Sequence, residues 1–282
     1  MGPVTAADLV RAGDVPADIV AELRDDHRTI RVRDTDLTDP RHGIRVVIPE
    51  ETDLWPAAQF RTYDIPGDSS SWVPPLVLWT RGSATLPDLW TRSVSVTGSR
   101  AATGYGLHVA ADLGYHLAER QITVTTGAGF GIEGNAVRGT LTGEGATVAV
   151  LPCGIDIAHP SAHQALLDRI SDTGAVISSF PPGTRPQLGR FVYRAGLLAA
   201  ASQVLVIVEC GVRSGSLAAV RQAHTMHRTV MVVPGPITSA ASAGSNRLLR
   251  DAAAIAITTL DEVGDNLDEA LRRGDSAPDV SC

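Results

Sequence analysis

The sequence predicts an α/β fold, in which an extended parallel sheet carries helices on both faces and follows a short N-terminal helical segment. Short apolar runs of strand length recur from residue 92 onward, and helix-compatible stretches separate them. These runs are apolar throughout, which is typical of strands that are covered on both sides. Strands that alternate with helices favour a single parallel sheet.

The predicted strands are short and rich in β-branched residues. In the main part of the chain they cover residues 94–97, 122–126, 147–151, 175–178, 204–208, 230–233 and 254–257. Before them we expect an isolated strand at 44–48 and another at 74–79, which begins with two prolines.

The clearest helical pattern covers residues 104–119, where apolar side chains recur at four-residue spacing. Four further stretches are helix-compatible: 161–170, 192–201, 214–224 and 245–252. Ser214 is a good N-cap for its helix, and residues 18–23 predict a short amphipathic helix. We divide the chain into an N-terminal helical segment (1–54), a Rossmann-like domain (55–263) and an acidic C-terminal tail (264–282).

The composition predicts a cytoplasmic protein without disulfides, metal or another cofactor. The spacings of Cys153, Cys210 and Cys282 match neither a disulfide framework nor a zinc site. The N-terminus lacks a basic segment followed by an apolar run, and no stretch approaches the roughly 20 apolar residues that span a bilayer. We therefore expect no contact with a membrane.

The net charge of −7 argues at first against a nucleic-acid partner, because binding a polyanion relies on neutralising its phosphates. The charge is unevenly distributed, however, since residues 92–257 hold 13 arginines against 9 acidic residues, a net charge of +4. All 24 basic residues are arginine, whose planar guanidinium suits phosphate contacts and stacking on bases. Codon usage in a GC-rich genome also explains the missing lysine.

Loops at the carboxyl ends of parallel strands are where ligands bind in such sheets. In the first of them, Gly98 allows a tight turn, while Ser99 and Arg100 with the helix-opening amides can hold an anion. A plain strand-to-helix turn with a solvated arginine is the alternative. In a later loop, Arg213, Ser214 and Gly215 precede a helix in the same way. Glu209 either orients Arg213 or a ribose hydroxyl, or is a strand-end acid in water.

A glycine-rich loop lies between these two and contains a formal GxGxxG from Gly129 to Gly134. The stretch that follows contains Asn135, Gly139 and Thr140 and is a poor helix former, and only Asp156 lies about where a ribose ligand is needed. Close approach of any phosphate or sugar backbone is therefore the more general interpretation. Farther along, Arg185, Arg190 and Arg194 accompany Phe180, Phe191 and Tyr193. Arginines beside aromatic side chains are typical of single-strand binders, although Phe180 and Phe191 could equally be core residues.

Seven segments occur in the order that is typical of one family. They are TGSR at 97–100, TGAGFGIE at 126–133, VAVLPCGID at 148–156, SFPPG at 179–183, RSGS at 213–216, VPGPI at 233–237 and SAGSN at 242–246. In this series the chain resembles the DNA processing protein A (DprA, or Smf) family from about Trp55 to Val263. The resemblance implies a non-enzymatic protein that binds single-stranded DNA, forms a homodimer and assists loading of RecA in DNA uptake or recombination.

Carried over residue by residue, the resemblance and the loop chemistry give one set of expected DNA contacts. These are Gly98, Ser99, Arg100, Gly127, Gly129, Phe130, Gly131, Arg190, Phe191, Arg194, Arg213, Ser214, Gly215 and Asn246. The sequence departs from the family at several of its motif positions. Phe130 replaces a basic or polar residue, Glu133 replaces an aspartate, and Ala195 and Gly196 replace an Asn-Arg pair, which removes one expected phosphate contact. We also expect the C-terminal winged-helix-like module of many members to be missing.

The sequence leaves two enzymatic alternatives to DNA binding. Related Rossmann-like proteins with nucleotide phosphoribohydrolase activity carry a Gly-rich PGGxGTxxE loop, and residues 208–216 lie in the comparable place but lack its final acid. An NAD-dependent oxidoreductase, suggested by Gly129 to Gly134, ranks below it.

Overall fold

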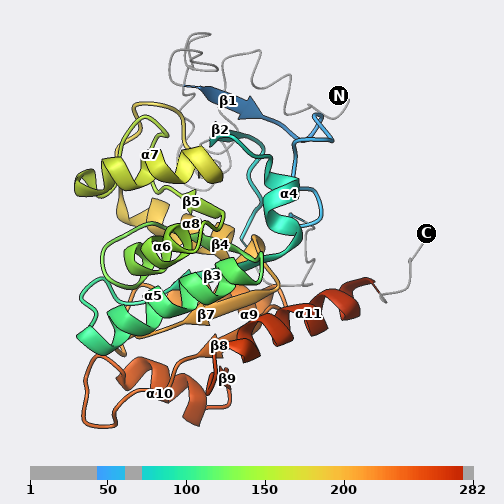
Figure 1. Cartoon of the computed structure of the whole chain (residues 1–282). Coiled ribbons are helices and arrows are strands. Elements are labelled where there is room, and N and C mark those ends of the chain that lie inside the picture. The colour runs from blue at the N-terminus through green and yellow to red at the C-terminus, as the bar shows by residue number, and fades with distance from the viewer. Residues whose placement is uncertain (1–42, 61–71, 276–282) are drawn as a thin grey trace.

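The computed structural model describes residues 43–60 and 72–275. Its centre is a nine-stranded sheet with the order β1-β2-β6-β5-β4-β3-β7-β8-β9 (Figure 1). The seven strands from β3 to β9 pair in parallel, whereas β2 pairs antiparallel with both β1 and β6. The predicted α/β class is therefore confirmed, with a sheet that is mostly parallel. The helix expected at 18–23 lies outside the described residues.

The strands are β1 (Ile44–Val47), β2 (Leu78–Gly82), β3 (Ser93–Thr97), β4 (Thr123–Thr126), β5 (Thr147–Val150), β6 (Ala175–Ser178), β7 (Val204–Ile207), β8 (Thr229–Val232) and β9 (Ile255–Ala256). The helices are α4 (Leu86–Thr91), α5 (Gly104–Glu119), α6 (Ile132–Thr142), α7 (Gln164–Thr173), α8 (Leu188–Ala200), α9 (Leu217–Thr225), α10 (Ala243–Arg250) and α11 (Asp261–Asp275), with a 3₁₀ turn at Ser161–His163.

Several expected elements differ from the observed ones. The strand expected to be isolated at 44–48 pairs with β2. The strand expected at 74–79 begins only at Leu78, because the two prolines before it cannot donate to a sheet ladder. Helix α4 was not predicted, although Thr85 caps its N-terminus and a proline occupies its first turn. Ser214 is not the N-cap that we expected, since α9 starts at Leu217.

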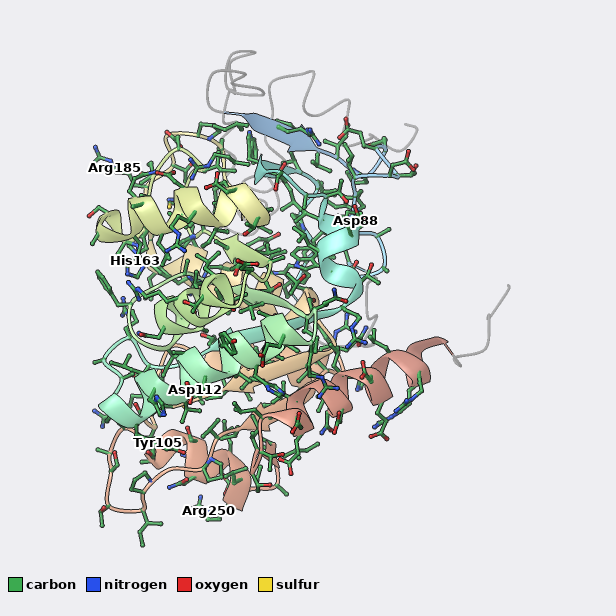
Figure 2. All side chains as sticks on the ribbon, in the orientation of Figure 1. Asp88, Tyr105, Asp112, His163, Arg185 and Arg250 are labelled. Atoms are coloured by element: carbon green, nitrogen blue, oxygen red, sulfur yellow. The ribbon has the colours of Figure 1, made fainter. Side chains whose placement is uncertain are left out.

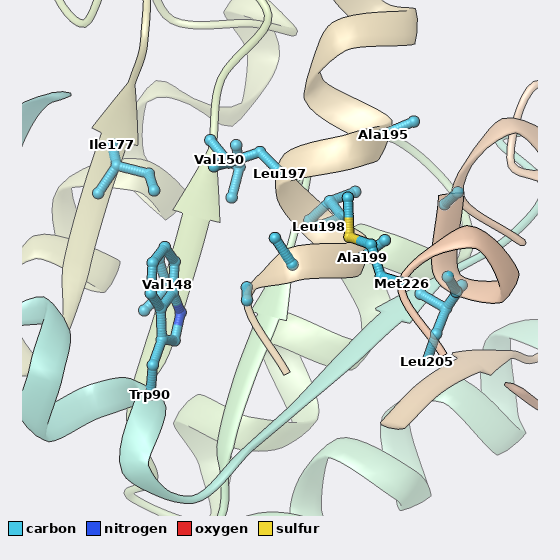
Figure 3. Packing of buried hydrophobic residues seen from close by; sticks show 14 of the residues in the cluster. Trp90, Val148, Val150, Ile177, Ala195, Leu197, Leu198, Ala199, Leu205 and Met226 are labelled. Atoms are coloured by element: carbon cyan, nitrogen blue, oxygen red, sulfur yellow. The ribbon is translucent and has the colours of Figure 1, made fainter. Parts of the chain in front are cut away.

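Helices cover both faces of the sheet. On the face turned toward the viewer of Figure 1, α5, α6, α7 and α11 pack their apolar sides on the strands. The opposite face buries a larger cluster with α4, α8 and α9, in which Trp90 lies beside Val148 (Figure 3). The Trp90 indole N–H donates to Thr125 Oγ1 at 3.0 Å, so this bulky side chain is buried without an unpaired donor.

The division of the chain into three parts stays a prediction. Strand β1 joins the main sheet, and Val263 and Leu267 of α11 are buried in the core that α5 and α6 share. Both chain regions near the expected boundaries therefore pack on the same sheet. No helix in the described ranges is long and apolar enough to cross a membrane.

The strand order places a topological switch between β3 and β7. From β3 the chain proceeds through β4, β5 and β6 on one side, and from β7 it proceeds through β8 and β9 on the other. The loops that follow β3 and β7 therefore leave the sheet in opposite directions. In open α/β sheets this is the place, at the carboxyl ends of the strands, where ligands bind.

Candidate functional site

A cavity of about 410 Å³ lies at the carboxyl ends of β3 and β4. It is formed by the loop after β3, the glycine-rich loop after β4, helix α6 and the 3₁₀ turn before α7. Its lining contains two arginines and no acidic residue. The lining residues are Arg100, Ala101, Ala102, Leu107, Phe130, Gly131, Asn135, Arg138, Ala162 and His163. We call this cavity the strand-end pocket.

The loop after β3 is fixed by its backbone. The amide of Ser99 donates to the carbonyl of Glu209 at 2.7 Å, and the Ser99 carbonyl accepts from Ile132 N at 3.1 Å. The loop is thus held between the start of α6 and the end of β7. Arg100 follows as an exposed residue at the rim of the strand-end pocket. Its position fits the anion-binding role that the sequence predicts.

The glycine-rich loop, residues 127–131, presents Phe130 at the pocket with 48% of its surface exposed. The Phe130 ring meets the buried His163 ring edge-on, at 4.8 Å between centroids. His163 Nδ1 lies 2.8 Å from the Ala128 carbonyl, and Nε2 lies 3.4 Å from Arg138 Nη2. Since arginine can only donate, Nε2 is the acceptor and the proton on Nδ1 points to Ala128. His163 therefore supports both Phe130 and Arg138.

The arginine and aromatic residues at the start of α8 do not form one exposed platform. Phe180 is buried, with the Arg190 guanidinium 5.5 Å from its ring centroid. Phe191 is partly exposed and contacts the ring of His159. Desolvation by burial lowers the pKa of His159, and the charges of Arg194 and Arg100 lower that pKa further. Arg190, Phe191 and His159 lie outside the pocket lining, but His159 is close enough to Arg100 and Arg194 to interact with their charges. This edge beside the pocket therefore carries positive charge, while Phe180 belongs to the core.

Arg194 lies below this edge, with its side chain 13% exposed. Its Nη2 is 3.5 Å from Glu133 Oε1, and Nη1 donates to the carbonyl of Gly127 at 3.2 Å. Two positions along α8, Gly196 packs against Trp72, whose indole would overlap any Cβ there. The arginine that the family has at this position could not fit here, which gives a structural reason for the departure.

Two polar side chains near the loops after β7 and β8, Glu209 and Asn246, form hydrogen bonds within the protein. Glu209 is buried, and its carboxylate accepts from Thr103 N at 2.7 Å and from Thr103 Oγ1 at 2.8 Å. It therefore anchors the N-cap of α5, which neither of its two sequence interpretations included. The Asn246 side-chain amide pairs with the backbone of Gly235 in both directions. Arg213 is exposed in the loop after β7.

Sequence reasoning missed three polar side chains of the strand-end pocket. Asn135 and Arg138 occupy the exposed side of α6, and His163 comes from a turn about 30 residues farther along. A signal for Arg138 was present, because the helix after a glycine-rich loop projects its first turns toward a bound anion. Figure 2 shows His163 and Arg185 on the same side of the molecule, although Arg185 does not line the pocket. No group of three metal-ligating side chains occurs among the described residues.

Residues 57–268 match the family model described as DNA recombination-mediator protein A. The chain belongs to this family. It is 42% identical over 265 residues to the putative DNA processing protein DprA of Mycobacterium tuberculosis, covering 93% of this chain and 68% of that protein. It is 32% identical over 246 residues to Protein Smf of Escherichia coli K12, covering 87% and 62% of the two chains. The resemblance found in the sequence is confirmed, and this family member spans about two thirds of those relatives.

Solved structures of family members have the same fold. DprA from Streptococcus pneumoniae superposes with a TM-score of 0.70 at 26% identity, covering 81% of this chain and 76% of that one. DprA from Helicobacter pylori, a structure described for its single-stranded DNA binding mode, gives a TM-score of 0.64 at 24% identity. That comparison covers 74% of this chain and 94% of the other. The extended Rossmann-like architecture is thus the family's architecture.

Proposed function

We propose that this protein binds single-stranded DNA across the strand-end pocket, without catalysing a reaction on it. The observation that carries the proposal is the pocket lining, in which Arg100, Arg138 and the exposed ring of Phe130 occur together with no acidic residue. Guanidinium groups beside an aromatic ring are suited to bind a phosphate and to stack the adjoining base. The H. pylori relative, described for its single-stranded DNA binding mode, supports the same ligand class.

The expected contacts divide into a central set and an outer set. Arg100, Phe130 and Gly131 line the pocket itself, while Gly98, Ser99, Gly127 and Gly129 shape the two loops around it. Arg190 and Phe191 extend the positive edge along α8. We place Arg213, Ser214, Gly215 and Asn246 in the outer set, whereas Arg194 lies under the glycine-rich loop and belongs to neither set.

The finer biological role is part of this proposal. By family resemblance we infer a cytoplasmic homodimer that assists RecA loading during DNA uptake or recombination. Sedimentation of the full chain tests the dimer, and RecA filament formation on coated single strands tests the loading. A monomer at micromolar concentration, or unchanged RecA kinetics, would contradict the corresponding part without affecting DNA binding.

A salt titration tests DNA binding itself. The anisotropy of labelled oligo-dT should report binding that weakens with salt, with a slope of log K against log salt near −0.7 for each neutralised phosphate. Arg100→Gln should weaken binding and reduce this slope by about one such increment. Arg221→Gln removes an exposed arginine from α9, outside the pocket lining, and should change neither value. No binding at low salt would exclude the proposal.

A nucleotide panel tests the non-enzymatic part. The protein is incubated with nucleoside monophosphates, and separately with NAD and a panel of alcohols and hydroxy acids as hydride donors, and released base or reduced cofactor is measured. We expect neither product, because a polymer-binding role requires no bond cleavage. Release of free base would favour the nucleotide phosphoribohydrolase alternative, and turnover of NAD would favour an oxidoreductase.

A further inference from the structure

An ion pair lies under the glycine-rich loop, beside the strand-end pocket. It joins Glu133 of α6 and Arg194 of α8, at 3.5 Å between Oε1 and Nη2. Only 6% of the Glu133 side chain and 13% of the Arg194 side chain are exposed. Charges so far from water are tolerated when they are paired, and removing one partner leaves the other uncompensated. Each residue therefore requires the other.

The Glu133 carboxylate ties three elements together. Its Oε1 accepts from Thr97 Oγ1 at 2.7 Å, and its Oε2 accepts from Gly129 N at 2.9 Å. Thr97 ends β3, Gly129 belongs to the glycine-rich loop, and Glu133 lies in the first turn of α6. A carboxylate in the first turn of a helix is also stabilised by the helix dipole.

Arg194 holds the other end of the same loop. Its Nη1 donates to the Gly127 carbonyl at 3.2 Å. The loop wraps the pair so closely that a Cβ at Gly127 would overlap the guanidinium, and a Cβ at Gly129 would lie 2.7 Å from Glu133 Oε2. Phe130, which follows Gly129 directly, provides the side chain that this loop presents at the pocket.

We propose that Glu133 and Arg194 are positioning residues, whose buried ion pair fixes the glycine-rich loop and thereby presents Phe130 to DNA. This inference rests on the proposed function. Arg194 then acts through the loop, in contrast to the direct DNA contact that the sequence predicts for it. Arg194 does not line the pocket, and its side chain is only 13% exposed with Nη1 and Nη2 directed at Gly127 and Glu133. Swinging the guanidinium outward to reach a phosphate would leave Glu133 buried without a countercharge, which is strongly unfavourable.

Salt dependence separates positioning from contact. Arg194→Gln should weaken oligo-dT binding at least tenfold while the slope of log K against log salt stays at the wild-type value. Arg100→Gln serves as the contact reference, with a slope reduced by about 0.7. An equal reduction of the slope in Arg194→Gln would show a lost phosphate contact and overturn the inference.

Arg194→Lys provides a second variant that retains the charge. Lysine can still attract a phosphate, but it lacks the planar fork that reaches both Gly127 and Glu133. We expect it to lose nearly as much affinity as Arg194→Gln. Wild-type affinity in Arg194→Lys would mean that the charge alone matters, which would contradict a positioning role.

Phe130 connects the pair to the ligand and gives a third readout. Phe130→Ala should weaken binding in the wild-type background, yet cause less than a twofold further loss when Arg194 is already Gln. Such non-additivity indicates that the two residues act on one step. If the fold losses of affinity in the two single variants multiply in the double variant, the ion pair does not act through Phe130.

Hydrogen exchange tests the loop without any DNA. Glu133→Ala removes the acceptor of the Gly129 amide, whose exchange should become at least tenfold faster in the folded protein. Glu144→Ala, at an exposed site just beyond α6, is the matched control and should leave it unchanged. Faster exchange in a protein that does not bind oligo-dT would reject the proposed function but retain the positioning role. Unchanged exchange would reject the positioning role.

Discussion

The loops after β3 and β4 and the loops after β7 and β8 lie at the same edge of one sheet and are similar in composition, but they differ in structure. On the first side, Arg100, Arg138 and Phe130 surround an open cavity. On the second, Glu209 is bound by the backbone and the hydroxyl of Thr103, and Asn246 by the backbone of Gly235. We therefore expect a loop of this composition to bind a ligand on the first side, where its arginine borders a cavity.

The largest expected effect is on stability and concerns the second side. Glu209→Ala removes both hydrogen bonds to Thr103 and should lower the free energy of unfolding by about 3 kcal/mol, since bonds to a buried carboxylate are strong. Urea unfolding followed by circular dichroism measures it. Glu119→Ala, at the exposed end of α5, should cost less than about 0.5 kcal/mol. Equal stability of the two variants would mean that Glu209 has no structural role on the second side.

The next effect is on binding and concerns the first side. Phe130→Ala should weaken oligo-dT binding by about 2 kcal/mol, the value typical of a lost base stack, without changing the salt slope. Val212, which is 52% exposed in the loop after β7, provides the matched apolar control on the second side. Val212→Ala should bind normally. A comparable loss in both variants would mean that DNA crosses both sides of the switch.

A smaller effect on binding should distinguish Arg138, which lines the pocket, from Arg213, which lies in the loop after β7. Arg138→Gln should weaken binding about fivefold and reduce the salt slope by about 0.7, as expected for one lost phosphate contact. Arg213→Gln should weaken binding less than about twofold, because Arg213 belongs to the outer set. Anisotropy titrations at four salt concentrations measure both. The reverse order would move the centre of the DNA site to the loop after β7.

The smallest effect is a pH dependence at the edge of the pocket. The folded protein lowers the pKa of His159 from its ordinary value of 6.5, so the unfolded chain takes up the proton first as the pH falls. The contribution of His159 to stability is therefore complete above pH 6.5 and decreases as the pH falls from 6.5 toward the lower folded pKa. As the pH is lowered below 6.5, the urea midpoint of unfolding should decrease less in His159→Gln than in wild type. Val212→Ala, which removes no titratable group, should decline as wild type does.

Much of the fold could be predicted because the buried strands are apolar throughout. Helix α5 was predicted with its observed bounds, since its apolar spacing and its capping residue Thr103 agree. The edge of the sheet was harder to predict. Strand β1 belongs to the sheet because it pairs with β2. The local sequence of a strand does not show which distant strand it pairs with. Helix α4 has only six residues, which is too short for a clear periodic pattern.

The candidate site was predictable at its loops but not at its contacts. Arg100 and Phe130 follow strands directly, so sequence order alone places them at the ligand-binding edge of the sheet. Sequence does not show which polar groups a neighbour already occupies. Arg194 and Asn246 match family motifs, and their atoms bind Glu133 and the Gly235 backbone. His163 contacts Phe130 across more than 30 residues of chain, a contact that only the folded structure reveals.

The placement of the tryptophans has a practical consequence. The chain contains four, and Trp55, Trp72 and Trp90 surround Phe60 while Trp79 lies in β2. None of the four lines the strand-end pocket. Their emission should therefore shift when the core opens and stay constant when an oligonucleotide is added. The protein thus carries its own optical reporter of folding: a variant that has only lost its binding site should keep the wild-type emission, and a destabilised variant should not.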